Sequence, residues 1–180
     1  MRELLDYWVD LRSASRSHLR VRLVALAGSA LFMLSMAAAG GGGPLAWTGL
    51  VVMGALVVFQ PTTLMPTVFA LFAVASWWAG VAGPWHWALL PAALGLLLVH
   101  ASASLASSVP PQASVPVSVV ELWAWRTLAV SALTALAWLL AALLVGIASP
   151  RGGAVPGIVA LAILTGALAY LAWVRARSSA

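Results

Sequence analysis

The chain has 180 residues, of which 63% are hydrophobic and only 7% are charged, whereas a typical soluble domain has about 45–50% apolar and about 25% charged residues. This composition excludes a soluble globular fold and indicates an integral membrane protein. The net charge is +5, but the arginines gather near the two ends of the chain, which is typical of membrane topology and excludes a nucleic-acid patch.

Residues 1–22 carry eight of the thirteen charges. Leu4, Trp8 and Leu11 recur at helical spacing within this stretch, so we predict a cytoplasmic amphipathic helix at the membrane interface. Residues 23–39 are predicted to form the first membrane span, which ends at a run of four glycines. A cleaved signal peptide is the alternative; the length and acidic residues of the first 22 positions argue against it.

Residues 45–107 contain no charged side chain, and their length fits three crossings of about 20 residues each. Turn-forming residues at 60–63 and 80–86 divide the stretch into predicted spans at 45–59, 64–80 and 87–107. The first two spans are short. Four spans with a re-entrant segment near residues 60–66 are therefore the alternative to six.

Residues 108–121 contain three prolines and are predicted to be an extended loop. The longest apolar stretch, residues 122–147, is the predicted fifth span, and residues 155–173 are the sixth. The predicted organisation is an all-α polytopic transmembrane helical bundle over residues 23–174, preceded by the amphipathic helix and followed by a cytoplasmic tail at 175–180.

Six spans place both ends of the chain on the same side of the membrane. Because arginine is favoured in cytoplasmic loops, we expect both termini in the cytoplasm and the protein in the plasma (inner) membrane. Loops 60–63 and 108–121 then lie inside, and loops 40–44, 81–86 and 148–154 lie outside. Most tryptophans fall at the predicted membrane boundaries, as amphipathic rings do.

Four polar residues are candidates for a site within the membrane. His100 is the one ionisable residue well inside a predicted span, and Ser104 shares its helical face; Gln60 and Thr63 lie at a predicted break. Such residues are possible pore, relay or ligand groups. The alternative is that His100 only bonds a neighbouring helix, which the lack of an intramembrane carboxylate favours.

Three residues near the predicted inner boundary are candidates for contacts with lipid or a partner protein. Trp8 lies on the amphipathic helix, and Glu121 and Arg126 flank the start of the long span. Five positions apart, Glu121 and Arg126 do not share a helical face well. We therefore expect Arg126 to reach lipid phosphate or a carboxylate of the N-terminal helix.

The sequence lacks the usual patterns of a catalytic or cofactor site. It has four acidic residues and no cysteine, and no phosphate-binding loop, nucleophile triad or metal-ligand spacing is present. We therefore predict a protein that is not an enzyme and holds no cofactor or metal. The leading hypothesis is a scaffold or accessory subunit that binds other membrane or cytoplasmic subunits within the lipid bilayer; the alternative is a small transporter or channel component.

The arrangement of several segments resembles a known group of proteins. These segments are the Arg-rich start, the proline-containing break at 60–66, a helix ending in Leu98-Val99-His100-Ala101, a proline-containing loop and Leu122-Trp123-Ala124-Trp125-Arg126. Over residues 20–147 the chain resembles small actinobacterial multi-pass membrane proteins encoded beside MoxR-type AAA+ ATPases and von Willebrand factor A-like proteins. The resemblance implies a membrane partner of an ATPase-linked assembly or of envelope maturation.

Overall fold

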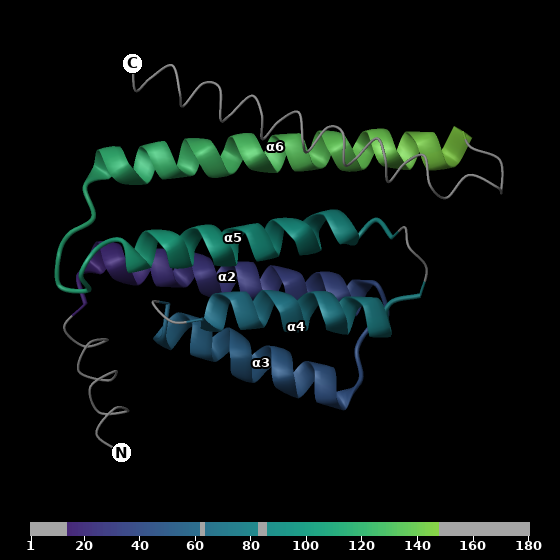
Figure 1. Ribbon diagram of the computed structural model, residues 1–180, viewed down its shortest axis with the longest axis horizontal. Helices are drawn as coiled ribbons and strands as arrows, with labels where there is room; N and C mark the ends of the chain where they lie inside the picture. Colours follow the sequence, from purple (N-terminus) through teal and green to yellow (C-terminus); the bar gives the residue numbers. More distant parts are fainter. Residues whose placement is uncertain (1–13, 62–63, 83–85, 148–180) are drawn as a thin grey trace. The chain divides into compact units, whose positions relative to one another are not determined.

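The computed structural model describes residues 14–61, 64–82 and 86–147, and all regular structure within these ranges is α-helical. This confirms the predicted all-α class. The helices in chain order are α2 (Arg16–Ala38), α3 (Pro44–Phe59), α4 (Met65–Gly80), α5 (Leu89–Ser107) and α6 (Val117–Ile147) (Figure 1).

Three of these helices are long and apolar enough to cross a membrane, namely α2, α5 and residues Val117–Leu143 of α6. Helices α3 and α4 have 16 residues each, which is about 24 Å of helix against a hydrocarbon core of about 30 Å. Helices α3, α4 and α5 begin and end within two residues of predicted spans, and α2 and α6 end within one residue of theirs. The sixth predicted span, residues 155–173, lies outside the described residues.

The first helix begins earlier than the hydropathy pattern predicts. Helix α2 starts at Arg16, where the hydroxyl of Ser15 accepts a hydrogen bond from the backbone N–H of His18 at 3.3 Å, a typical N-cap. Residues 16–22 are therefore continuous with the first apolar helix, and the structure has no break after Arg22. The rest of the predicted amphipathic helix, residues 1–13, lies outside the described residues.

The loop after α5 is shorter than predicted. The proline pattern predicts that residues 117–121 are extended, but they form the start of α6, so this part of the prediction is wrong. Pro116 is the last proline of the loop, and its carbonyl accepts hydrogen bonds from the N–H groups of Val119 and Val120. Proline is well tolerated at the start of a helix, because the first N–H groups have no partner there.

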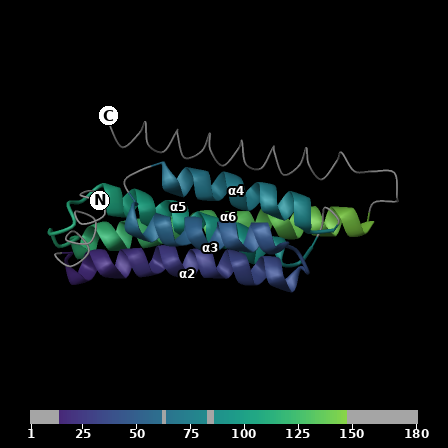
Figure 2. The ribbon, with the colours of Figure 1, turned by 90° about the horizontal axis from the view of Figure 1, so that it is seen from below.

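The described residues form two compact units, one ending at Ala129 and the other beginning at Val130 within α6. In the first unit, α2, α3, α4 and α5 run alternately in opposite directions (Figures 1 and 2). Each of the four packs against two others: α2 contacts α3 and α5, and α4 contacts the same two. The result is a four-helix up-and-down bundle, to which residues 117–129 of α6 are connected.

The core of this bundle draws side chains from all four helices. The buried residues are Ala25, Phe32, Met36, Leu50, Val57, Phe69, Ala73, Ala92 and Val99. Phe32 meets Phe69 edge-to-face with ring centroids 6.4 Å apart, and it lies 6.2 Å from the ring of Trp77. Such pairs stabilise the core beyond simple burial.

The closest helix pair in the bundle is α2 and α5, which cross at two glycines. A Cβ atom added to Gly28 would lie 2.7 Å from the carbonyl oxygen of Gly95, and one added to Gly95 would lie 2.7 Å from the carbonyl oxygen of Gly28. The two backbones are therefore in direct contact. Small residues that let backbones approach are a main source of helix association in lipid, where apolar side chains have no preference for protein over lipid tails.

The turn between α2 and α3 depends on glycine for a different reason. Gly40 and Gly42 have φ angles of 69° and 96°, which residues with a Cβ rarely adopt. Pro44 then begins α3, where its fixed φ suits the first helical turn. We call the end of the bundle that holds this turn and the α4–α5 connection the glycine end.

Candidate functional site

The opposite end of the bundle carries the charged residues at the start of α2. We call it the basic end; it comprises Ser15 to Arg22 and the α5–α6 loop, residues 108–116. Three hydrogen bonds hold the loop on α2. Pro111 O accepts from the N–H of Ser15 at 2.9 Å, Ala113 O accepts from the Ser15 hydroxyl at 2.9 Å, and the N–H of Val115 donates to Ser17 Oγ at 3.0 Å.

An apolar cluster also holds the loop. It consists of Val21, Leu105, Ala106 and Val115, with Val109, Val120 and Trp123 packed against it. Trp123, in the second turn of α6, adds a hydrogen bond: its indole N–H donates to the carbonyl of Ala101 on α5 at 2.8 Å. This bond connects the start of α6 to the bundle.

His18 lies at the centre of the basic end and is only 1% exposed. Its Nε2 atom is 3.1 Å from the carbonyl oxygen of Ala106, at the end of α5. Because a carbonyl only accepts, Nε2 carries the hydrogen of this bond. Nδ1 has no hydrogen-bond partner among the described residues. His18 therefore bonds α2 to α5 through one ring nitrogen and keeps the other buried.

The arginines of α2 divide into one buried and two exposed side chains. Arg22, one turn after His18, is only 6% exposed, whereas Arg16 and Arg20 are exposed. The two exposed guanidinium groups place positive charge at the surface of the same helix start that holds the loop through Ser15 and Ser17. Arginine is suited to carboxylate and phosphate groups, because its planar fork of N–H donors matches two oxygens at once.

The burial of His18 and Arg22 was not among the predictions from the sequence. The signal was present, because the two positions continue the buried stripe of α2 backwards by one and two turns. The buried residues of this helix are His18, Val21, Arg22, Ala25, Gly28, Ser29, Phe32, Ser35 and Met36. This spacing of three and four is that of a helix face packed against a nearly parallel neighbour.

The predicted polar residues of the membrane region do not form a common site in the part of the chain that the structure describes. His100 and Ser104 are exposed on α5, and the hydroxyl of Ser104 donates to the carbonyl of His100 at 2.9 Å. Gln60 is half-buried and caps the end of α3, where its N–H donates to Leu56 O at 2.7 Å. Thr63 lies outside the described residues.

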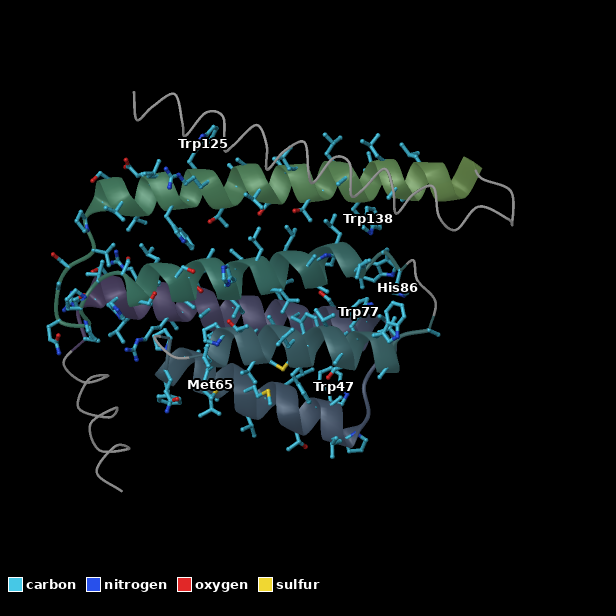
Figure 3. All side chains as sticks on the ribbon, viewed as in Figure 1. Trp47, Met65, Trp77, His86, Trp125 and Trp138 are labelled. Atoms are coloured by element: carbon cyan, nitrogen blue, oxygen red, sulfur yellow. The ribbon has the colours of Figure 1, made fainter. Side chains whose placement is uncertain are left out.

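The predicted partner residues are at the surface where they are described. Glu121 and Arg126 are exposed on the first part of α6, and Trp8 lies outside the described residues. Trp125, also exposed, lies on the same part of this helix (Figure 3). Glu121 is the one acidic residue within the described ranges.

The candidate site cannot be assigned from metal ligands or from similar proteins. Among the described residues there is no group of three or more His, Cys, Asp or Glu side chains that would hold a metal ion. Comparisons with protein-family models, curated proteins and solved structures find no match to the chain. The candidate site is therefore the basic end, defined by its own geometry.

Proposed function

We propose that this protein is a non-enzymatic membrane scaffold or accessory subunit, and that the basic end is the surface by which it holds a partner. The observation that supports this most directly is the docking of the 108–116 loop on Ser15 and Ser17 through three hydrogen bonds. A loop held in one conformation loses little entropy on binding, so it is a better docking surface than a free loop.

The charge of the surface favours an acidic partner. Arg16 and Arg20 are exposed in the first two turns of α2, and charge complementarity selects partners and raises the rate of association. A cytoplasmic subunit with an acidic face fits this chemistry. It also fits the ATPase-linked assembly that the sequence resemblance implies.

We propose in addition that the chain crosses the plasma (inner) membrane six times, with both termini in the cytoplasm. The alternating directions of α2 to α5 put the start of α2 and the 108–116 loop at one end, and the α2–α3 turn at the other (Figure 1). Arginine lies at the first end, and residues 39–43 and 81–88 contain no acidic or basic residue except His86. The positive-inside rule then makes the basic end cytoplasmic.

Cysteine labelling tests this orientation. The chain has no native cysteine, so Ser114→Cys on the docked loop and Ala82→Cys after α4 each give one exposed thiol. With a membrane-impermeant maleimide on intact cells, we expect Ala82→Cys to be labelled and Ser114→Cys to be labelled only after permeabilisation. The reverse pattern would overturn the orientation.

Native co-purification tests the partner surface. We expect the wild-type protein, extracted in mild detergent, to carry a second protein identified by mass spectrometry. Arg16→Gln with Arg20→Gln is expected to reduce the bound partner about tenfold, since two surface charge pairs contribute about 1.4 kcal/mol together. Ser17→Ala, which removes the acceptor for Val115 N–H, should weaken the complex in the same direction.

The comparison variant is Arg126→Gln, which removes an exposed arginine outside the basic end. Because the sequence also makes Arg126 a candidate for partner contact, this variant separates the two surfaces: if the basic end holds the partner, the complex should stay intact. Equal loss with this variant would show a general charge effect and contradict the assignment of the surface. Recovery of a lone monomer would contradict the scaffold function itself. A homo-oligomer that passes solute in liposomes would support the alternative transporter or channel function.

A further inference from the structure

A cavity of about 540 Å³ lies between α4 and α5 near the glycine end of the bundle. Helix α2 supplies one side of it through Phe32, and Trp77 and Phe32 are in ring contact there. Figure 3 shows that Trp77 and His86 both lie at this end of the bundle. The main lining residues are Phe32, Trp77, Trp78, Leu89, Ala93 and Leu96.

The cavity has a packing cause: α4 and α5 make few contacts, and small residues of α5 lie opposite the large side chains of α4. Helices α4 and α5 contact each other less than any other neighbours in the bundle. On α5, Ala92 and Ala93 line the space where larger side chains would fill it. The packing that closes α2 on α5 at Gly28 and Gly95 therefore does not extend to the α4–α5 side.

The chemistry of the lining excludes polar ligands. The side chains around the cavity are aliphatic or aromatic, and the indole N–H groups of Trp77 and Trp78 are their only hydrogen-bonding groups. A polar group that enters without a partner costs about 1–3 kcal/mol. A hydrocarbon has no such cost. The cavity also lies between two apolar helices, which places lipid tails beside it in a membrane.

The volume is in the range of ligand sites. The cavity measures about 540 Å³, whereas typical small-molecule pockets measure about 300–1,000 Å³ and one water occupies about 30 Å³ of liquid. It therefore has room for an apolar group far larger than water. We propose that the cavity binds one acyl chain of a bilayer phospholipid.

The residues beside the cavity suit the polar part of such a lipid. Leu89, which lines the cavity, donates its N–H to the carbonyl of His86 at 3.0 Å. The Nδ1 atom of His86 accepts from Ala88 N–H at 3.2 Å, so in the neutral ring Nε2 carries the hydrogen and is a donor for an ester or phosphate oxygen. The ring centroid of Trp87 lies 5.7 Å from that of His86, with the rings tilted by 35°, and Trp87 is 64% exposed, as interfacial tryptophans are.

Photo-crosslinking tests the proposal in the full-length protein. The probe is a phosphatidylcholine with a diazirine near the end of one acyl chain, reconstituted with the protein in liposomes. After irradiation and digestion, we expect residues 74–81 and 89–96 to be labelled about fivefold more than the exposed Val51 and Val52 of α3, which corresponds to about 1 kcal/mol of preference. Equal labelling of the two regions would mean ordinary lipid contact and would overturn the proposal.

Two alanine variants sharpen the test. Ala93→Leu fills the cavity and should reduce the labelling of residues 74–81 to the level of α3. Ala55→Leu adds the same group at an exposed position of α3, which does not line the cavity, and should leave the labelling unchanged. A wild-type pattern in Ala93→Leu would contradict the site. If Ala93→Leu fails to fold, the wild-type labelling ratio still decides the matter, and neither result depends on the partner bound at the basic end.

Discussion

Replacing Gly28 or Gly95 by alanine is expected to destabilise the bundle by about 1–3 kcal/mol, the usual cost of overpacking a close interface. In either variant the new Cβ atom would lie 2.7 Å from a carbonyl oxygen of the facing helix. Backbone oxygens cannot move aside as a side-chain end does, so α2 and α5 must separate. This separation loosens the core along the whole pair, including the contact of His18 with Ala106.

Gly54 is the control, because its replacement by alanine should not lower the free energy of unfolding. Gly54 is a buried residue of α3, but a Cβ atom there would meet nothing closer than 3.5 Å. Alanine is favoured over glycine within a helix by about 1 kcal/mol. Gly54→Ala should therefore be neutral or stabilising, whereas Gly28→Ala and Gly95→Ala destabilise.

Unfolding in mixed micelles with increasing SDS measures these changes. The signal is the intrinsic fluorescence of the tryptophans, and the free energies of unfolding of the three variants are compared with wild type. Because Gly28 and Gly95 meet at one point, the double variant should cost less than the sum of the single variants. Equal stabilities for Gly28→Ala and Gly54→Ala would show that α2 and α5 do not pack backbone to backbone.

Phe32→Ala is expected to cost about 2–3 kcal/mol of stability, less than the 3–5 kcal/mol typical of soluble cores, because lipid tails offer the ring a similar apolar environment. Phe32 is only 2% exposed and contacts the rings of Phe69 and Trp77. The loss is therefore one of packing between three aromatic rings. The same substitution removes one wall of the α4–α5 cavity and enlarges it.

The control for Phe32→Ala is Leu34→Ala on the same helix. Leu34 is 68% exposed, so its removal should change the free energy of unfolding by less than about 0.5 kcal/mol. The same SDS titration applies to both variants. A small effect at Phe32, comparable to that at Leu34, would contradict the aromatic core that joins α2 to α4.

The helices themselves could be predicted from the sequence to within a few residues, apart from two starts. Each helix is a continuous apolar stretch between glycine or proline turns, and these signals are local. The two errors have local causes. Ser15 caps α2 several residues before the apolar stretch begins, and α6 starts directly after Pro116 although its first residues are less apolar.

The candidate site could be predicted less well, because its residues are brought together by packing. His100, Ser104 and Gln60 stand out in the sequence as polar residues within apolar segments, but His100 and Ser104 lie at the surface of α5. His18 and Arg22 belong to the predicted surface helix, yet both are buried, and His18 bonds the end of α5. Polarity along the chain does not show which face of a helix meets a neighbour.

The sequence by itself determined that the chain is helical, that its helices are apolar enough for a membrane, and at which end the charges lie. These properties follow from the transfer of each segment between water and lipid, which depends on composition alone. The tertiary structure decided that α2 pairs with α5, that the loop docks on Ser15 and Ser17, and that a cavity opens between α4 and α5. In lipid, hydrophobicity does not choose between neighbours; close packing at Gly28 and Gly95 and a few hydrogen bonds do.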